Sequence, residues 1–295
     1  MTSAPVTSTI SIARILVATD FSPVSDNALL YALPVAEFYN AALYVLHVTT
    51  PARLPLPSME FEPLPSDYGQ AQAEEQFQAL EKSALLARYR HWLVLEQGEV
   101  AALVREAVAK HEIELVVVGT HGHGGVFKMV MGSVAEEVFR EVQCPVMTVG
   151  PQVPKCERWG FRRILLATDY QKGSMRALPY AMSLAQAGAE IILVHALTSG
   201  GWLPSEAGRM IAAEETRLKS VLPPEICPDG GVEVVAEFGS PAEVIVRVAE
   251  QRGADLIVMG TRQTESRRAA THLPWSVAHQ VVHDARCPVL TVRGQ

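Results

Sequence analysis

The chain has 295 residues, of which 48% are hydrophobic and 19% charged, the length of two domains and the composition of a chain with a substantial core. A net charge of −7 leaves no basic field to hold a nucleic-acid backbone, and no apolar run approaches the roughly 20 residues that cross a bilayer. The first residues lack the basic and apolar regions of a signal peptide, and the four cysteines form no CxxC pair. We therefore expect a cytoplasmic protein with neither nucleic-acid nor membrane partners.

In the first half, short apolar runs alternate with apolar residues at helical spacing. The runs predict strands at residues 15–18, 43–48, 91–95, 114–118 and 145–149. The helical patterns predict helices at residues 26–39, 70–90, 99–111 and 133–141. The segment Pro51–Gly69 stands apart, because the five prolines from Pro51 to Pro65 exclude a regular helix. It is either a flap over a site or an exposed surface loop.

The second half repeats this order of elements, with strands predicted at residues 164–167, 191–195, 232–237, 256–259 and 289–292. Alternation of strands and helices predicts a parallel sheet that is covered by helices on both faces and joined by right-handed crossovers. Ligands of such sheets bind at the carboxyl ends of the strands, where the strand order reverses.

Four sequence blocks recur in the same order in both halves, which is the signature of an internal repeat. Arg14–Asp20, with the sequence RILVATD, returns 149 residues later as Arg163–Asp169, with the sequence RILLATD. The three later pairs are 116–120 with 257–261, 133–135 with 276–278, and 144–146 with 287–289. The blocks predict two homologous domains, residues 1–150 and residues 151–295.

A glycine-rich segment of the first half has the features of a phosphate-binding loop. Gly119, Gly122 and Gly132 lie between a predicted buried strand and a helix that begins at Ser133 and Val134. Glycines let the backbone approach a ligand closely, and successive N–H groups together with the positive end of a helix attract an anion. Ser133 is also a suitable N-cap, a structural role that requires no phosphate.

Asp20 follows the first predicted strand at the same edge of the sheet. Its carboxylate can accept a hydrogen bond from a ribose hydroxyl or hold a divalent cation beside phosphates, or it can cap the helix that follows. The glycine spacing is neither the Walker A pattern nor the dinucleotide fingerprint, so the loop belongs to another class.

The spacing G-x2-G-x9-G-S from Gly119 to Ser133 resembles, at every position, the signature of the ATP-binding branch of the universal stress protein family. The strand end ATD, the second strand with LHV and the last strand with CPV are similar to that family as well. Because the resemblance covers nearly the whole chain twice, the chain is similar to a tandem universal stress protein.

The resemblance implies an α/β fold of two flavodoxin-like (Rossmann-like) domains in tandem, each with a five-stranded parallel sheet, packed as an intrachain pseudo-dimer through their last strands. It also implies ATP, with Mg²⁺, at the carboxyl ends of the strands of the first domain. By position in the motif, Val48 meets the adenine through its backbone, and Asp20 and Gly119 lie near the ribose. The resemblance also implies that the remaining residues of the motif bind the phosphates: Gly122, Gly132, Ser133 and Val134.

The second half departs from the glycine pattern. Gly260 is retained, but Gln263 stands at the second glycine and Trp275 at the third, with Pro274 before it. Trp275 would crowd the space that a phosphate needs, so we expect a degenerate loop that does not bind a nucleotide in the usual pose. The arginines of this loop are interpreted as a solvated basic surface, with an anion site of another kind as the alternative.

No residue pattern predicts a metal centre or a catalytic residue. An HExxH pattern and a Gly-x-Ser-x-Gly elbow are both missing from the sequence. His47 and His195 end the second strand of each half and are interpreted as packing or capping residues. His279 and His283 form an i,i+4 pair without a nearby third ligand. The other histidines that invite a metal hypothesis are not part of an HExxH pattern either: His121, His123 and His272.

Three classes of function remain open. The first is an ATP-binding regulatory protein of the stress response, whose nucleotide changes a surface for an unknown protein partner. The second is a slow ATPase or a self-phosphorylating enzyme with Ser133 as acceptor, and the third is a structural module that binds no nucleotide. The intact glycine spacing favours the first class, and the lack of a base or an arginine finger favours a binding protein with at most weak ATP hydrolysis. Homodimerisation of whole chains stays open.

Overall fold

A computed structural model describes residues 10–49, 68–120, 133–157, 160–198, 204–222, 231–261 and 277–293. Contacts divide these residues into two compact units. One unit holds residues 12–49, 68–120 and 133–144, and the other holds residues 10–11 together with the described residues from 145 onward. The boundary between the units therefore falls just before the last strand of the first repeat, whereas the repeat pattern of the sequence divides the chain after residue 150.

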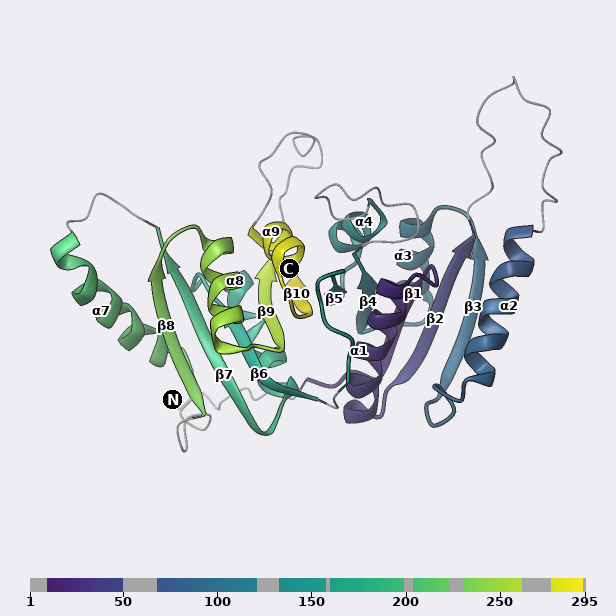
Figure 1. Ribbon diagram of the computed structural model, residues 1–295, viewed down its shortest axis with the longest axis horizontal. Coiled ribbons are helices and arrows are strands. Elements are labelled where there is room, and N and C mark those ends of the chain that lie inside the picture. Colours follow the sequence, from purple (N-terminus) through teal and green to yellow (C-terminus); the bar gives the residue numbers. More distant parts are fainter. Residues whose placement is uncertain are drawn as a thin grey trace, which may run out of the picture. The chain divides into compact units, whose positions relative to one another are not determined.

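The unit of the first repeat has a parallel sheet with the strand order β3-β2-β1-β4. Its strands are β1 (Arg14–Thr19), β2 (Ala42–Thr49), β3 (His91–Gln97) and β4 (Leu115–Gly119). Its helices are α1 (Pro23–Tyr39), α2 (Tyr68–Lys82), α3 (Val100–Lys110) and α4 (Ser133–Glu141). Helix α1 packs on β1 and β4, α2 packs on β2 and β3, and α3 contacts α4 (Figure 1).

The first helix shows how the sequence sets an element of this fold. Ser22 has an extended backbone, and its side chain accepts a hydrogen bond from the backbone N–H of Ser25, which makes it the N-cap of α1. Pro23 follows at the first helical position, where the missing N–H costs nothing. The helix ends at Asn40, which adopts the left-handed conformation with φ 50°. The predicted helix at residues 26–39 is confirmed and extended by one turn at its start.

Helix α2 is shorter than predicted. It ends at Lys82, whereas the pattern of the sequence extends a helix to Arg90. Ala84 has a φ of 57°, which breaks the helical path, and the hydroxyl of Ser83 donates to the carbonyl of Leu80 at 2.6 Å. Residues 83–89 therefore form turns before β3.

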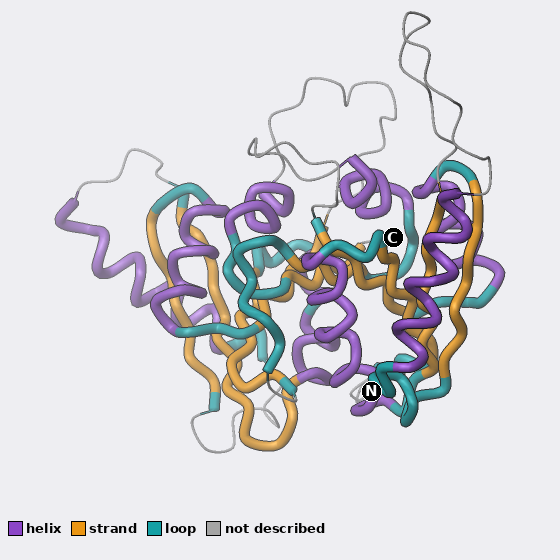
Figure 2. The backbone as a smooth tube through the Cα atoms, turned by 45° about the vertical axis from the view of Figure 1, so that its right-hand side comes forward, coloured by secondary structure: helices purple, strands orange, loops and turns teal. Residues whose placement is uncertain are grey.

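The unit of the second repeat has the strand order β5-β10-β9-β6-β7-β8. Its strands are β5 (Val146–Val149), β6 (Phe161–Ala167), β7 (Ala185–Leu197), β8 (Val232–Phe238), β9 (Leu256–Thr261) and β10 (Val289–Arg293). Its helical segments are α5 (Lys172–Met175), α6 (Leu178–Leu184), η1 (Pro204–Glu206), α7 (Ala207–Lys219), α8 (Pro241–Arg252) and α9 (Val277–Asp284). Figure 2 shows strands flanked by helices in both repeats.

The first helix of the second repeat is broken into two pieces, in contrast to α1. Gln171 takes the N-cap position of α5 but makes no side-chain capping bond, and Pro179 lies in the first turn of α6, where it cannot donate to the preceding turn. Helix α6 then runs directly into β7, which starts at Ala185 and is longer than the predicted strand at 191–195. The segment that forms one continuous helix in the first repeat, through Pro34, is thus two short helices in the second.

The last strands of the two repeats pair with each other. Strand β5 runs antiparallel to β10, with Thr148 opposite Val289 and Val146 opposite Thr291. The buried hydroxyl of Thr148 donates to the carbonyl of Val289 at 3.2 Å, and that of Thr291 donates to the carbonyl of Val146 at 3.1 Å. Thr148 and Thr291 are corresponding residues of the two repeats, as are Val146 and Val289. Each strand therefore donates the same side-chain hydrogen bond to the other.

The predicted tandem α/β fold with flavodoxin-like sheets is confirmed by this arrangement. The sheets are parallel except at the β5–β10 pair. No helix in the described ranges is long and apolar enough to cross a membrane. The predicted loop Pro51–Gly69 lies outside the described residues except for its last two.

We expect the Thr148→Val variant to lose about 1 kcal/mol of unfolding free energy, because the buried hydrogen bond to Val289 is lost while the side-chain shape is kept. Thr291→Val should lose a similar amount. Urea unfolding measures both, with Thr216→Val on the exposed face of α7 as control, where the loss should be smaller. Two variants as stable as the wild-type chain would show that the hydroxyl bonds do not stabilise the pair.

Candidate functional site

The candidate site of the first repeat lies where the strand order of its sheet reverses. The chain passes from β1 to β2 and β3 on one side, and returns to β4 on the other. The crevice at the carboxyl ends of β1 and β4 is therefore the topological switch point, at which ligands of such sheets bind. In Figure 1, α4 lies toward the edge at which β2 and β3 end.

The predicted site residues in the described ranges all come to this edge. Asp20 directly follows β1, Val48 is the last residue but one of β2, and Gly119 is the last residue of β4. These three strands are neighbours in the sheet. Helix α4 begins with Ser133 and Val134, as predicted. The other two loop residues of the prediction, Gly122 and Gly132, lie outside the described residues.

Hydrogen bonds fix the turn that carries Asp20. Its carboxylate oxygen Oδ1 accepts from the backbone N–H of Ser22 at 3.1 Å, and the hydroxyl of Thr19 accepts from the N–H of Phe21 at 3.0 Å. The sequence left open whether Asp20 caps the helix that follows. The N-cap of α1 is Ser22 and not Asp20. Asp20 instead supports the turn in front of the cap and holds a carboxylate at the switch point.

Phe21 is forced into an unfavourable backbone conformation at this turn. Its φ is 57°, in the left-handed region, which costs a residue with a side chain roughly 1–2 kcal/mol. Its ring packs against those of His47 and Phe77, with centroid distances of 4.8 and 5.3 Å. The sequence patterns did not predict this ring cluster, although the match of Phe21 with the aromatic residue Tyr170 in the second repeat is a signal for it.

Gly119 has a packing role that is independent of any ligand. A Cβ at this position would lie 3.1 Å from the backbone nitrogen of Ser25 and 3.1 Å from a methyl group of Val24. The start of α1 can thus approach the end of β4 because the strand ends in glycine. Gly260 has the same place in the second repeat, where a Cβ would overlap with the backbone of Gly173 and Ser174. The retention of the first glycine in both repeats is explained by this close approach.

The corresponding turn of the second repeat uses its aspartate differently. Because Gln171 replaces the capping serine, the hydroxyl of Ser174 donates to Oδ1 of Asp169 at 2.6 Å instead of taking part in a serine cap. The N–H of Gln171 donates to the same oxygen at 3.0 Å. Asp169 is therefore bound into the start of the broken helix by two hydrogen bonds at one oxygen.

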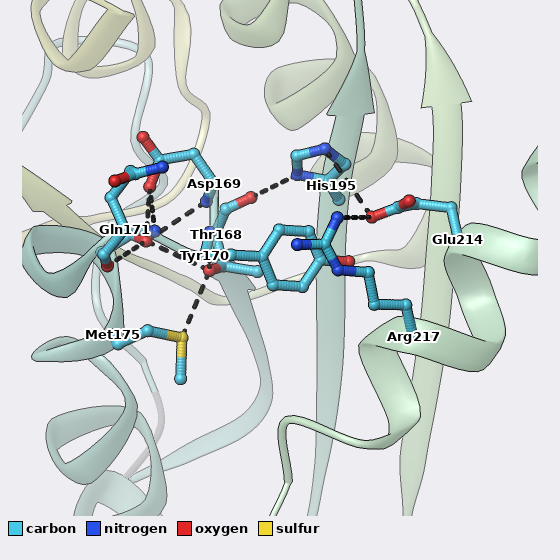
Figure 3. Close-up of polar contacts among 9 residues, drawn as sticks. Thr168, Asp169, Tyr170, Gln171, Met175, His195, Glu214 and Arg217 are labelled. Carbon is cyan, nitrogen blue, oxygen red and sulfur yellow. Dashed lines mark hydrogen bonds and ion pairs between the residues drawn. The ribbon is translucent and has the colours of Figure 1, made fainter.

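A polar cluster replaces the ring cluster of the first repeat (Figure 3). Tyr170, with a φ of 62°, packs against His195 at a centroid distance of 4.8 Å, as Phe21 packs against His47. Helix α7 brings to this cluster Glu214, whose Oε1 lies 3.9 Å from Nε2 of His195 and 3.8 Å from the guanidinium of Arg217. The Arg217 guanidinium lies 4.0 Å from the centre of the Tyr170 ring.

This cluster changes the chemistry of the Tyr170 phenol. Burial raises the pKa of Tyr170 above its ordinary value, and the Glu214 carboxylate raises it further, whereas the Arg217 charge lowers it. The phenol therefore keeps its proton at a pH at which an exposed tyrosine ionises. The first repeat has no ionisable group in place of this phenol, because Phe21 is apolar.

The two histidines at the strand ends have structural roles, as predicted from the sequence. Nδ1 of His47 lies 2.8 Å from the carbonyl oxygen of Thr19, and Nδ1 of His195 lies 2.7 Å from that of Thr168. Within the described ranges, no group of three or more His, Cys, Asp or Glu side chains is placed to hold a metal ion. Gln263 and Trp275, which define the degenerate loop of the prediction, lie outside the described residues, as do His121, His123 and His272.

The fold and the site thus define the class of the protein. It is a tandem α/β protein with an aspartate, Asp20 or Asp169, in the turn after the first strand of each repeat. The model of the universal stress protein family matches the chain twice, at residues 11–150 and 160–293. The chain belongs to the universal stress protein family, and both repeats are members of it.

Relatives with known names and structures agree with this assignment. Universal stress protein Rv1996 of Mycobacterium tuberculosis is 26% identical, with 95% of this chain and 94% of the relative covered. A single-repeat universal stress protein of Thermus aquaticus is 33% identical over 45% of this chain and 99% of its own length. The crystal structure of a universal stress protein from Archaeoglobus fulgidus has a TM-score of 0.69 and 21% identity, and the match covers 95% of this chain and 98% of that one. This last similarity supports the fold.

We expect Gly260→Ala to lower the unfolding free energy by about 1–3 kcal/mol, because the added methyl group forces the start of α5 away from β9. Gly119→Ala should cost less, since its closest contacts leave more room. Denaturant unfolding measures the difference. Gly208→Ala is the control, because nothing lies within 4 Å of a Cβ at this helical position. An equal cost at all three positions would contradict the packing role.

We expect Tyr170→Phe to weaken the alkaline loss of stability. A phenol with a raised folded-state pKa stabilises the fold below its unfolded pKa of about 10, and this contribution is lost as the pH rises through the folded value. Unfolding free energies measured from about pH 8 upward should therefore fall less steeply in the variant than in the wild-type chain. Identical slopes would show that the environment of Tyr170 does not perturb its ionisation.

Proposed function

We propose that the first repeat binds ATP with Mg²⁺ and that this occupancy regulates the protein in a stress response. The observation that carries the proposal is the position of Asp20, Val48 and Gly119 on three neighbouring strands at the switch point, in the repeat whose glycine spacing is intact. The second repeat supports the contrast, because its loop sequence has lost two of the three glycines.

The chemistry of the donor set fits an adenine nucleotide. A carboxylate at Asp20 accepts from ribose hydroxyls or ligates Mg²⁺, and the backbone of Val48 offers one donor and one acceptor to the edge of an adenine. The first N–H groups of α4, from Ser133 and Val134, have no partner within a helix and suit phosphate oxygens. We assign Gly122 and Gly132 to the phosphates by their positions in the motif. Bound ATP would supply the negatively charged phosphates that these donors suit.

The same residues favour binding over turnover. In the described part of the site the only carboxylate that directly follows a strand of the first sheet at its carboxyl end is Asp20, and the proposal gives it to ribose or Mg²⁺. Phosphoryl transfer needs further charge and a positioned nucleophile. A slow ATPase or a phosphate transfer to Ser133 is the competing function, and a nucleotide-free structural module is the third. Unidentified protein partners and cytoplasmic location belong to the proposal as well.

The first experiment is to denature freshly purified protein and to identify and count the released nucleotide. About one ATP per chain supports a single working site, and ADP in its place would favour turnover. About two per chain would contradict the degenerate second loop. No nucleotide, together with no binding on titration with ATP and Mg²⁺, would contradict the proposal and favour a structural module.

Asp20→Asn should raise the dissociation constant for ATP by about tenfold or more, because the charged acceptor for ribose or Mg²⁺ is lost while an oxygen remains to support the turn. Isothermal titration calorimetry measures the change. Asp169→Asn is the matched control in the second repeat and should leave the affinity unchanged. If the two variants bind ATP equally well, Asp20 is not part of the site.

A further inference from the structure

One histidine of the first repeat connects the two strands that carry the proposed nucleotide contacts. A carbonyl oxygen can only accept, so the 2.8 Å contact between His47 and Thr19 fixes a proton on Nδ1 of the ring. Thr19 and His47 are also directly opposite each other in the β1–β2 register. Asp20 follows Thr19, and Val48 follows His47, so the bond joins the residues that precede both proposed contacts.

Two aromatic rings keep this connection in place. The ring of Phe21 packs on His47 at an interplanar angle of 37°, and the ring of Phe77 stands edge-on to both, with centroid distances of 5.3 Å to Phe21 and 6.4 Å to His47. Phe77 is only 7% exposed. This packing offsets the unfavourable left-handed backbone of Phe21 and thereby holds the turn at Asp20 in one conformation.

The cluster also connects the site to a helix that contributes none of the proposed contacts. Phe77 belongs to α2, and Phe21 is adjacent to Asp20. A conformational preference at the turn is therefore transmitted to α2 through direct ring contacts. In the second repeat the same histidine bond exists, but α7 brings the charged side chains of Glu214 and Arg217 to His195 and Tyr170, and Asp169 accepts from Ser174.

We propose that His47, with Phe21 and Phe77, is a positioning device for the nucleotide, which sets the distance between the Asp20 carboxylate and the Val48 backbone and couples occupancy of the site to α2. The inference rests on the proposed function of the first repeat. His47 does not itself contact the nucleotide, and it acts through Thr19 and through the ring of Phe21.

The test compares ATP dissociation constants of His47→Ala, His47→Asn and His195→Ala. His47→Ala should raise the dissociation constant about tenfold, because the ends of β1 and β2 are no longer held in register with the ligand. His47→Asn should stay within about threefold of wild type, since its amide can donate from the position of Nδ1. His195→Ala loses the equivalent bond in the second repeat and should bind as wild type does.

Unfolding free energies separate a positioning role of His47 from a purely structural one. The two alanine variants lose bonds of nearly equal length, so their unfolding free energies should fall by similar amounts while only His47→Ala loses affinity. If wild type binds ATP and His47→Ala binds equally well, the positioning role is wrong and the proposed function stands. If wild type does not bind ATP, both are wrong. Equal weakening by His47→Asn and His47→Ala would also overturn the role of the hydrogen bond.

Hydrogen exchange tests the coupling to α2. ATP should slow amide exchange in residues 68–82 of the wild-type chain, and Phe77→Leu, which keeps an apolar side chain but removes the ring, should reduce this protection while the protein stays folded. The same exchange in α7 serves as the internal control and should not respond to ATP. Protection of α2 that is unchanged in Phe77→Leu would contradict the coupling.

Discussion

The close approach of a helix start to a strand end determines the geometry of both repeats. The backbone around Val24 and Ser25 rests against Gly119, and the backbone of Gly173 and Ser174 rests against Gly260. A Cβ would overlap with this backbone at Gly260 and would be crowded by it at Gly119. The close approach leaves the chain a single turn in which to leave the first strand and enter the helix. The aspartate and the left-handed aromatic residue of each repeat lie in that short turn.

One substitution at the helix cap separates the chemistry of the two turns. In the first repeat a serine caps the helix, and the aspartate supports the turn in front of it. In the second repeat Gln171 makes no side-chain capping bond, and the carboxylate of Asp169 accepts a hydrogen bond from the hydroxyl of Ser174. The polar cluster around Tyr170 accompanies this change, as does the break between α5 and α6. The divergence of the repeats thus extends from the loop sequence into the packing beneath it.

The sequence was sufficient for the repeat, the order of the elements and the edge of the sheet at which the site residues gather, because buried strands and glycine spacing are local signals. Helix ends were less predictable, since the end of α2 depends on the backbone of Ala84, and α1 continues through Pro34 whereas its counterpart breaks just before Pro179. The cluster of Phe21, His47 and Phe77 was not predicted, because it joins residues that are distant in sequence and similar to ordinary core positions. Predicting it requires the register of β1 and β2 and the placement of α2.

The pairing of β5 with β10 has an evolutionary consequence. When two identical chains pair through a last strand, every substitution enters both copies at once, so a change that improves one ligand site alters its twin. Here the paired strands belong to one chain, and each side supplies one threonine hydroxyl to the other. Selection can therefore act on the two sites separately while the pairing of β5 with β10 is preserved. An apolar cluster under one turn and a charged cluster under the other are the outcome that such independence permits.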